Sequence, residues 1–435
     1  MIESYLNRIE TRKATIGIVG LGYVGLPLAV EFVKAGFPLL GLDVDTRKVE
    51  DLLASKTYIK HIPESIIGDI NRTGRFDATT DFSRSAECDA MIICVPTPLN
   101  DHRDPDMSYI VSTAKTLSRY IRKGQMFCLE STTYPGTTEE VLKPVLERDS
   151  GLKAGTDFFL AYSPEREDPN NTHYSTSTIP KVVGGHDPDS LKAACALYDT
   201  IICETVPVTS MATAEATKLM ENIFRAVNIA LVNELKVVFG KMNIDVWEVI
   251  EAAKTKPFGY MPFYPGPGLG GHCIPIDPFY LTWKAREYDS PTRFIELAGE
   301  INTHMPYYVV RRTMEIMNEH GIVINGCRML LMGVAYKKNV DDTRESPTFK
   351  LWRLYEEKGA RIDYYDPFCP IIPKLRDYPE YEGKQSVSMD QIKGYDVIVV
   401  ATDHDEVDYQ KVAGGGRIVI DTRNAVPAAS HVYGA

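Results

Sequence analysis

The sequence predicts an α/β protein made of two doubly wound, Rossmann-like domains joined by a long central helix and a small helical domain. Three observations predict this class. Short apolar runs alternate with helical segments in the first and last parts of the chain, a glycine-rich turn follows the first run, and one later segment keeps a single apolar face for about thirty residues. The chain has 435 residues, which is too long for one core and fits two or three domains.

Composition narrows the kind of protein. Hydrophobic residues make up 44% and charged residues 25% of the chain, as in an ordinary globular protein, and the net charge of −11 argues against nonspecific binding to nucleic acid or an anionic membrane. The first residues are polar where a signal peptide has its apolar core, and no apolar stretch is long enough to span a membrane. We therefore expect a cytoplasmic protein that binds neither membranes nor nucleic acid.

The eight cysteines form no CxxC pair, and several lie inside apolar runs. This pattern predicts reduced thiols and no metal centre.

The first domain is predicted over residues 1–207, as a dinucleotide-binding Rossmann domain. A strand at 15–19 leads into the glycine turn at 20–25 and then into a helix from residue 26. Further apolar runs at 39–43, 90–95, 126–130 and 158–162 continue a parallel α/β pattern to about residue 205.

The central helical domain is predicted over residues 208–322. Apolar residues recur at helical spacing between 210 and 242, which predicts one long helix. Such a helix either lies beneath its own domains or offers a dimer surface, and we favour a homodimer or higher homo-oligomer. A proline- and glycine-rich stretch at 256–268 follows it and predicts a shaped loop over a site.

The last domain is predicted over residues 323–435. Apolar runs at 328–333, 361–366, 396–401 and 417–421 alternate with helical segments. This is a second α/β unit, and it has no GxGxxG turn of its own.

The glycine turn predicts a nucleotide cofactor. Gly20 permits the tight turn, Gly22 lets the backbone approach a pyrophosphate, and Gly25 lets helix and strand pack closely. Asp43 ends the next strand, where a carboxylate suits the free ribose hydroxyls of NAD and repels the 2′-phosphate of NADP. Lys48 lies near enough in sequence to reach such a phosphate, which leaves NADP open. A turn that has lost its ligand is the less favoured alternative.

A single cysteine suggests covalent chemistry. Cys273 follows two consecutive glycines and His272 in a proline-rich loop, where its thiolate is able to attack an aldehyde. Taken alone, a buried inert thiol is the more common reading. Adjacent side chains in an extended segment point to opposite faces, so we do not expect a direct pair with His272.

Seven separated motifs carry a family resemblance. They are residues 20–27 (GLGYVGLP), 95–98 (VPTP), 130–132 (EST), 163–166 (SPER), 218–222 (KLMEN), the loop at 265–278 and residues 336–346 (YKKNVDDTRES). In this order they resemble the UDP-glucose/UDP-hexosaminuronate 6-dehydrogenase family over essentially the whole chain. The sequence of the 265–278 loop is most similar to that of bacterial UDP-N-acetylglucosamine 6-dehydrogenases.

The resemblance implies a four-electron oxidation of the sugar C6 hydroxyl to a carboxylate, with two NAD used in succession. Cys273 would form a thiohemiacetal with the intermediate aldehyde and then a thioester. The resemblance also implies a UDP-sugar as the substrate and a uronate for surface polysaccharide, such as O-antigen or capsule, as the product.

Roles for single residues follow from the resemblance. Lys218 and Asn222 would stabilise an oxyanion at C6, Asp277 would organise water and Lys218, Glu165 would be the general base, and Thr132 would orient a water. The implied cofactor contacts also include Tyr23, Val24, Thr97, Thr132 and Arg344. The implied substrate contacts are Glu165, Arg166, Lys218, Asn222, Tyr264, Gly270, Lys337 and Arg423.

Several alternatives remain at this level. The same chemistry on UDP-glucose, UDP-N-acetylgalactosamine or UDP-N-acetylmannosamine is the nearest. A two-electron β-hydroxyacid dehydrogenase has no use for Cys273 or for the second α/β unit, and a noncatalytic NAD-binding protein would bind cofactor without turnover. The loop aromatics Phe258, Tyr260, Phe263 and Tyr264 are read equally well as pocket lining or as packing anchors.

Overall fold

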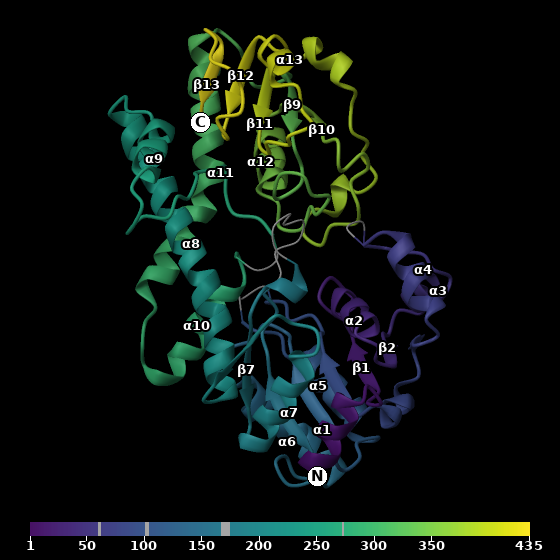
Figure 1. Ribbon diagram of the computed structural model, residues 1–435. Coiled ribbons are helices and arrows are strands. Elements are labelled where there is room, and N and C mark those ends of the chain that lie inside the picture. The colour runs from purple at the N-terminus through teal and green to yellow at the C-terminus, as the bar shows by residue number, and fades with distance from the viewer. Residues whose placement is uncertain (60–61, 101–103, 167–174, 272–273) are drawn as a thin grey trace. The chain divides into compact units, whose positions relative to one another are not determined.

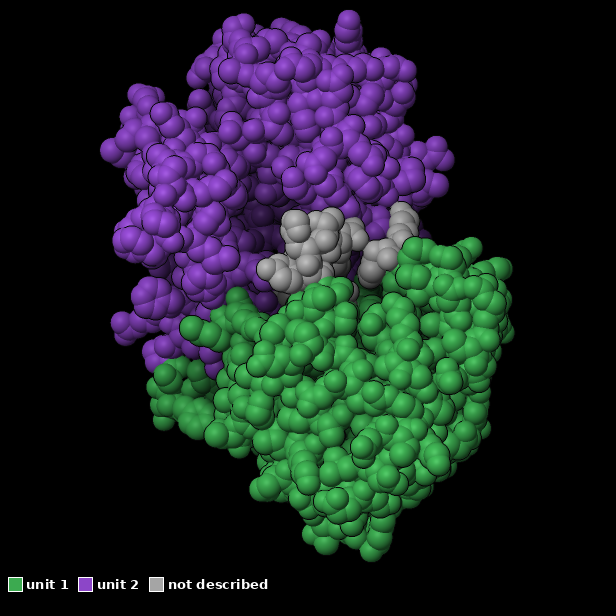
Figure 2. Space-filling view, in the orientation of Figure 1, with its two compact units in different colours: residues 1–221, 283–290 green, residues 222–282, 291–435 purple. Residues whose placement is uncertain are grey.

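The computed structural model describes residues 1–59, 62–100, 104–166, 175–271 and 274–435 (Figure 1). The chain forms two compact units, shown in Figure 2. Unit 1 comprises Met1–Glu221 with Trp283–Ser290, and unit 2 comprises Asn222–Thr282 with Pro291–Ala435. Each unit contains one largely or wholly parallel sheet, so the predicted fold class is confirmed. The division into three domains stays a prediction.

Unit 1 contains an eight-stranded sheet in the order β3-β2-β1-β4-β5-β6-β7-β8. The first six strands are parallel and follow the order of dinucleotide-binding sheets, which reverses between β1 and β4. The strands are β1 (Ile16–Val19), β2 (Leu39–Leu42), β3 (Phe76–Thr79), β4 (Ala90–Ile93), β5 (Met126–Leu129), β6 (Phe159–Tyr162), β7 (Lys181–Gly185) and β8 (Thr205–Val208). The expected parallel pattern ends at β6, because β7 pairs with it antiparallel.

Helices cover this sheet because its inner strands have two apolar faces. Every residue of β1, β4, β5 and β6 is buried, and buried clusters lie on both sides of the sheet. The helices of unit 1 are α1 (Ile2–Glu10), α2 (Gly25–Lys34), α3 (Thr46–Leu53), α4 (Glu64–Arg72), α5 (Ser108–Ser118), α6 (Lys143–Ser150) and α7 (Pro188–Tyr198). Short turns of helix lie at η1 (Phe82–Glu87), η2 (Thr138–Leu142) and η3 (Thr176–Thr178), and η2 is a π-helical turn that leads into α6.

Unit 2 contains a parallel five-stranded sheet in the order β10-β9-β11-β12-β13. Strand order reverses between β9 and β11, as in flavodoxin-like sheets. The strands are β9 (Arg328–Met332), β10 (Arg361–Tyr365), β11 (Val397–Val400), β12 (Ile418–Asp421) and β13 (Val432–Gly434). The helices beside them are α12 (Pro347–Glu356) and α13 (Tyr409–Ala413), with short turns η5 (Pro379–Tyr381) and η6 (Met389–Gly394).

The predicted long helix is confirmed as α8 (Met211–Lys241), which begins in unit 1 and continues into unit 2. It is followed by α9 (Val246–Lys254), α10 (Asp277–Ala285), η4 (Arg286–Tyr288) and α11 (Arg293–Glu319). Asn302 of α11 contacts α8, where it donates to the carbonyl of Ala226 and accepts from Asn233. No described helix is both long enough and apolar enough to cross a membrane.

The buried side of α8 differs from the apolar face that periodicity predicted. Leu231 and Val238 belong to the predicted apolar face, and they are 52% and 43% exposed. The buried stripe instead carries five polar side chains at helical spacing: Glu215, Lys218, Asn222, Asn233 and Lys236. Glu215, Asn222, Asn233 and Lys236 each hydrogen-bond to another segment, and Lys218 forms an ion pair, so these polar groups tolerate burial.

Candidate active site

The glycine turn joins β1 to α2 at the point where the strand order reverses. Gly20 has φ +90°, and a Cβ there would lie 2.5 Å from the carbonyl oxygen of Cys94, so only glycine fits. A Cβ on Gly25 would meet the Gly20 carbonyl at 2.0 Å. At Gly22, by contrast, no described atom lies within 4 Å of the Cβ position, which leaves the backbone open to a ligand.

Asp43 fixes this turn from the end of β2. Its Oδ2 accepts the backbone N–H of Leu21 at 2.9 Å, and its Oδ1 accepts that of Asp45 at 3.0 Å. Lys48 forms an ion pair with Asp43 at 3.3 Å, and the Tyr58 hydroxyl donates to the Leu21 carbonyl. The structure therefore brings Lys48 to the carboxylate that is expected to bind ribose.

The residues present fit a dinucleotide. No described side chain caps the amino end of α2, so the positive end of the helix dipole is available to phosphate oxygens. Tyr23 is 39% exposed beside the open backbone of Gly22, and Val24 lines a pocket. The turn, the helix end and Asp43 together match what bound NAD requires.

Thr97 and Thr132 connect the loops that follow β4 and β5. The Thr97 hydroxyl donates to the Thr132 carbonyl at 2.7 Å, and the neighbouring Ser131 hydroxyl donates to the Val95 carbonyl at 2.7 Å. These bonds hold two predicted cofactor contacts together at the carboxyl edge of the sheet.

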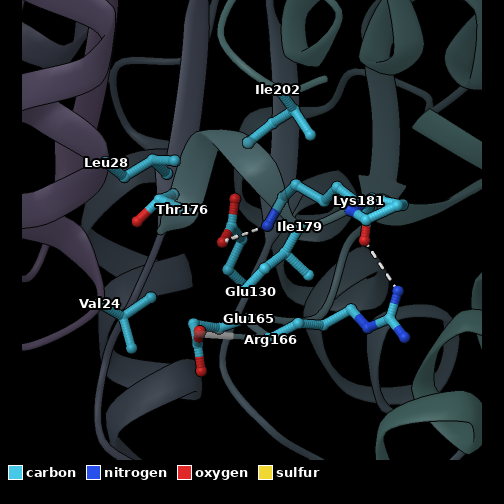
Figure 3. Close-up of a pocket in the computed structure, with 10 residues that line it drawn as sticks. Val24, Leu28, Glu130, Glu165, Arg166, Thr176, Ile179, Lys181 and Ile202 are labelled. Carbon is cyan, nitrogen blue, oxygen red and sulfur yellow. Dashed lines mark hydrogen bonds and ion pairs between the residues drawn. The ribbon is translucent and has the colours of Figure 1, made fainter. Parts of the chain in front are cut away.

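A small pocket of unit 1 gathers charged groups (Figure 3). The ammonium of Lys181 points to the Glu130 carboxylate at 2.9 Å and also donates to the Pro164 carbonyl at 3.3 Å. Glu165 follows Pro164, and Arg166 donates to the Pro180 carbonyl and to Glu221. The lining residues are Val24, Leu28, Glu130, Glu165, Arg166, Thr176, Ile179, Pro180, Lys181 and Ile202.

Burial and two nearby lysines act in opposite directions on the pKa of Glu165. Its Oε2 is 3.6 Å from Nζ of Lys218, and the two side chains are 19% and 8% exposed. Burial raises the pKa of Glu165, while the positive charges of Lys218 and Lys181 oppose that rise. A largely buried carboxyl with a raised pKa suits a group that takes up a proton from a substrate.

Glu130 and Lys181 form a buried ion pair that was not predicted from the sequence. Both are almost fully buried, and Glu130 also accepts from the Tyr198 hydroxyl at 2.5 Å. Glu130 begins the motif at residues 130–132, but its partner Lys181 is 51 residues away, in strand β7, which contains none of the seven motifs. Nothing in the local sequence reveals that Lys181 anchors the loop before Glu165.

Glu215 is a second unassigned residue, one helical turn before Lys218 on α8. It is fully buried and accepts the backbone N–H of Gly136 at 2.5 Å, the N–H of Thr138 at 2.9 Å and the Thr138 hydroxyl at 2.7 Å. Burial raises the pKa of Glu215 to about 7 despite these donors. It ties the loop that contains Thr132 to the helix that carries Lys218.

Asn222 and Asp277 meet within unit 2. Nδ2 of Asn222 donates to Oδ2 of Asp277 at 2.6 Å, and both residues are buried. Asp277 is the first residue of α10, where a carboxylate is favoured by the helix dipole. Cys273, four residues before it, lies outside the described residues together with His272.

Gly270 and Gly271, which precede Cys273 in the sequence, pack closely against the side chain of Tyr336. A Cβ on Gly270 would lie 2.7 Å from Cβ of Tyr336, and Gly271, with φ +84°, would bring a Cβ to 2.9 Å from the Tyr336 ring. The Gly271 N–H also donates to the Arg344 carbonyl at 3.1 Å. Larger residues are excluded here by contact with Tyr336.

A second pocket, of about 270 Å³, lies at the carboxyl edge of the unit 2 sheet, beside the reversal between β9 and β11. Ligands of open α/β sheets bind at this position. Four predicted substrate contacts line it: Tyr264, Gly270, Lys337 and Arg423. The remaining lining residues are Ile229, Gly266, Gly268, Leu269, Ile274, Tyr336, Lys338 and Asp403.

Arg423 is built into the wall of this pocket. Its Nε donates to the Ala401 carbonyl at 2.8 Å, and Asp403 lies 3.9 Å away. A Cβ on Gly266 would lie 2.6 Å from Arg423 Nη1, so the loop approaches the guanidinium closely. Tyr264 stacks on Trp247 and donates to Glu251, so this loop aromatic is both an anchor and a lining residue.

Arg344 does not line either pocket. It forms a two-point ion pair with Asp342, whose oxygens lie 2.6–3.1 Å from Nε and Nη2. Its predicted contact with a pyrophosphate stays a prediction.

Comparisons with known proteins cover most of the chain. Residues 14–202 match the NAD binding domain, residues 212–304 the central domain and residues 330–428 the UDP binding domain of the UDP-glucose/GDP-mannose dehydrogenase family. The match confirms the predicted NAD cofactor.

Individual relatives differ in the sugar that their names give. The chain is 36% identical to a UDP-N-acetyl-D-glucosamine 6-dehydrogenase of Pseudomonas aeruginosa, over 90% of each chain. It is 33% identical to a UDP-N-acetyl-D-mannosamine dehydrogenase of Methanocaldococcus jannaschii, over 94% of this chain and 92% of that protein. The solved structure of a UDP-D-ManNAc dehydrogenase from Pyrococcus horikoshii superposes with a TM-score of 0.87 at 30% identity, over 97% of this chain and 98% of that one.

Proposed function

The chain belongs to the UDP-glucose/GDP-mannose dehydrogenase family, and we propose that it oxidises C6 of UDP-N-acetylglucosamine to a carboxylate with NAD. The relatives named above are dehydrogenases of UDP-sugars by name, and residues 14–202 match an NAD binding domain. The choice of UDP-N-acetylglucosamine is supported by the name of the relative from Pseudomonas aeruginosa and by the sequence of residues 265–278.

The buried pair of Glu165 and Lys218 carries the proposal. A base is needed to take the hydroxyl proton, and a cation is needed to stabilise the developing oxyanion at C6. Glu165 has a raised pKa that suits the first task, and Lys218 lies 3.6 Å from it to supply the second. NAD, when bound, accepts the hydrogen and electron pair that leave C6.

Asn222 and Asp277 would support the same carbon. The Asn222 amide donates to Asp277 at 2.6 Å, and this bond fixes the orientation of the amide before substrate binds. An oriented amide donates to an oxyanion at C6, while the Asp277 carboxylate organises a water.

Cys273 would divide the second oxidation into two easier steps. Its thiolate adds to the C6 aldehyde and forms a thiohemiacetal, whose oxidation gives a thioester, and water then cleaves the C–S bond to release the carboxylate and the thiol. Over both oxidations one alcohol, two NAD⁺ and one water give one carboxylate, two NADH and three protons. Thr132 orients the water in this proposal.

The pocket of unit 2 would hold the nucleotide of the substrate. Lys337 and Arg423 supply positive charge for a diphosphate in a protein whose net charge is −11. Tyr264 and Gly270 lie beside them, so an aromatic face and open backbone meet the sugar-nucleotide. Arg166 is a further proposed substrate contact.

The product would enter surface-polysaccharide synthesis in the cytoplasm. A sugar uronate activated as a UDP derivative is a donor for glycosyl transfer, which suits the assembly of an O-antigen or capsule. We also propose a homodimer or higher homo-oligomer, since Met220, Phe224, Leu231 and Val238 of α8 are exposed apolar side chains.

A panel of UDP-sugars tests the proposal. Purified protein is incubated with NAD and with UDP-N-acetylglucosamine, UDP-N-acetylmannosamine, UDP-N-acetylgalactosamine or UDP-glucose, and NADH and product mass are measured. Two NADH and one carboxylate from UDP-N-acetylglucosamine support the proposal. UDP-N-acetylmannosamine is the second candidate, because the relatives from Methanocaldococcus jannaschii and Pyrococcus horikoshii are named for it. A preference for this sugar would change the proposed substrate and leave the proposed reaction as it is. One NADH per sugar would reject the four-electron reaction.

A further inference from the structure

Asp366 joins two loops at the carboxyl edge of the unit 2 sheet. It follows β10 and is 1% exposed, and its Oδ2 accepts the backbone N–H groups of Val334 at 2.7 Å and Ala335 at 3.1 Å. Its Oδ1 accepts those of Phe368 and Cys369. Burial opposes its charge, yet these bonds and His404 hold the pKa of Asp366 below its ordinary value.

His404 joins a third loop to this carboxylate. It is fully buried after β11, its Nε2 lies 3.1 Å from Asp366 Oδ2, and its Nδ1 lies 3.0 Å from the backbone nitrogen of Asn339. A backbone N–H only donates, so Nδ1 accepts and carries no proton. Nε2 therefore carries the hydrogen and donates to Asp366, and the ring is held in one tautomer.

Asn339 ends the segment that lines the pocket. It has φ +61°, a left-handed conformation, and its side chain exchanges two hydrogen bonds with Asp405. Lys338 also reaches Asp405, at 3.0 Å. The pocket-lining residues Tyr336, Lys337 and Lys338 are thus fixed at one end by the Ala335 contact to Asp366 and at the other by Asn339.

We propose that His404 is a positioning residue of the sugar-nucleotide pocket: its Nδ1, kept an acceptor because Nε2 donates to Asp366, accepts the backbone N–H of Asn339 and so holds Lys337 and Lys338 where they meet a nucleoside diphosphate. This inference rests on the proposed function of the same pocket. His404 does not line the pocket itself and acts through the loop.

The physical reason is the flexibility of lysine. A lysine ammonium binds phosphate as a point charge on a long stem, so its position depends on where its backbone is fixed. If the bond to Asn339 is lost, the loop keeps its lysines but samples more positions, and part of the binding free energy is spent on ordering it. Affinity for the diphosphate falls, while the chemistry of bound substrate stays the same.

Two substitutions separate this role from simple packing. His404→Asn puts an amide near the position of Nδ1, which keeps an acceptor for the Asn339 N–H and loses Asp366. His404→Gln puts its amide near the position of Nε2, which keeps the contact to Asp366 and loses Asn339. His320→Gln is the matched control, because His320 is exposed, bonds to the Tyr433 hydroxyl and does not line the pocket.

Calorimetry with UDP and with NAD on the full-length protein gives the readout. We expect His404→Gln to weaken UDP binding about tenfold or more, and to raise KM for the UDP-sugar with kcat unchanged. His404→Asn and His320→Gln should stay within about threefold of wild type for UDP, and all three variants should bind NAD as wild type does.

The outcomes distinguish this inference from the function beneath it. Equal UDP affinities for His404→Gln and His404→Asn would overturn the inference alone. Failure of the wild-type protein to bind UDP would overturn the proposed function, and the inference with it.

A measurement on the wild-type protein tests the inference even if a variant does not fold. In wild-type protein with ¹⁵N-labelled histidine, His404 should show the Nε2–H tautomer, and its signals should move on addition of UDP and not of NAD. An Nδ1–H tautomer, or signals that UDP leaves unchanged, would overturn the inference.

Discussion

Nζ of Lys218 lies 3.6 Å from Oε2 of Glu165, and both side chains are largely withdrawn from water. The distance is that of an ion pair rather than a short hydrogen bond. The positive charge of Lys218 opposes the rise in the pKa of Glu165 that burial causes, and the ammonium is the cation that a developing oxyanion would need.

Replacing Lys218 by methionine should change both the rate and its pH dependence. We expect kcat to fall by about a hundredfold or more, because the oxyanion at C6 loses its cation. Removal of the positive charge also raises the pKa of Glu165 further, so the acid limb of kcat should move to higher pH. Steady-state rates across the pH range measure both effects. Lys241→Met at the end of α8 is the control, and an unmoved acid limb would contradict the pairing with Glu165.

Asp43 should decide between NAD and NADP. Asp43→Asn removes the charge that repels a 2′-phosphate, and Lys48 then has no carboxylate partner within the described part of the chain. We expect NAD affinity to fall about tenfold and the ratio of NADP to NAD affinity to rise. Fluorescence titration with each dinucleotide measures it, with Asp45→Asn as the neighbouring control. An unchanged ratio would exclude Asp43 as the selecting residue.

Glu215 should give the protein a pH-dependent stability. Its pKa is about 7 in the folded chain against an ordinary value of 4.5, so folding favours the protonated form. The stabilisation is fully present below the ordinary value and is lost as pH rises through about 7. The melting temperature of wild type relative to Glu215→Gln should therefore decline between about pH 5 and 8. Glu234→Gln, an exposed position on α8, should show no such trend, and parallel curves for wild type and Glu215→Gln would refute the shift.

Asn222→Asp should disable the enzyme without unfolding it. The substitution sets a second carboxylate where Nδ2 now lies 2.6 Å from Asp277, and two anions in a buried position repel. We expect the dehydrogenase rate to fall about a hundredfold or more, while NAD still binds. Asn228→Asp, at an outward position of α8, is the matched control. Full activity of Asn222→Asp would remove this amide from the reaction.

Cys273→Ser should uncouple cofactor binding from product release. Serine is a poorer nucleophile at neutral pH, so the aldehyde is not converted into the thioester that water cleaves. We expect normal NAD binding and no uronate by mass spectrometry. Undiminished uronate would remove the thiol from the mechanism.

The fold was predictable because its signals are local. Every predicted apolar run in both α/β parts forms a strand, since a buried strand needs several apolar residues in succession and little else. The glycine turn and Asp43 were also predictable, because they sit at fixed offsets within one βαβ unit.

The inside of α8 was not predictable from its periodicity. Apolar spacing identified the helix, but the buried stripe carries polar side chains whose partners are 33 to 199 residues away in the sequence. The same distance hid the contacts of Lys181 with Glu130 and of His404 with Asp366, because a hydrogen bond between remote loops leaves no local pattern.

The polar stripe on α8 makes the length of this helix as important as its sequence. An α-helix turns by about 100° per residue, so one inserted residue after Lys218 would swing Asn222, Asn233 and Lys236 toward solvent together. Substitutions on the outer side disturb none of these bonds, whereas an insertion or deletion breaks several at once. Natural variation in this segment should therefore consist of replacements, with gaps tolerated only as whole pairs of turns of about seven residues.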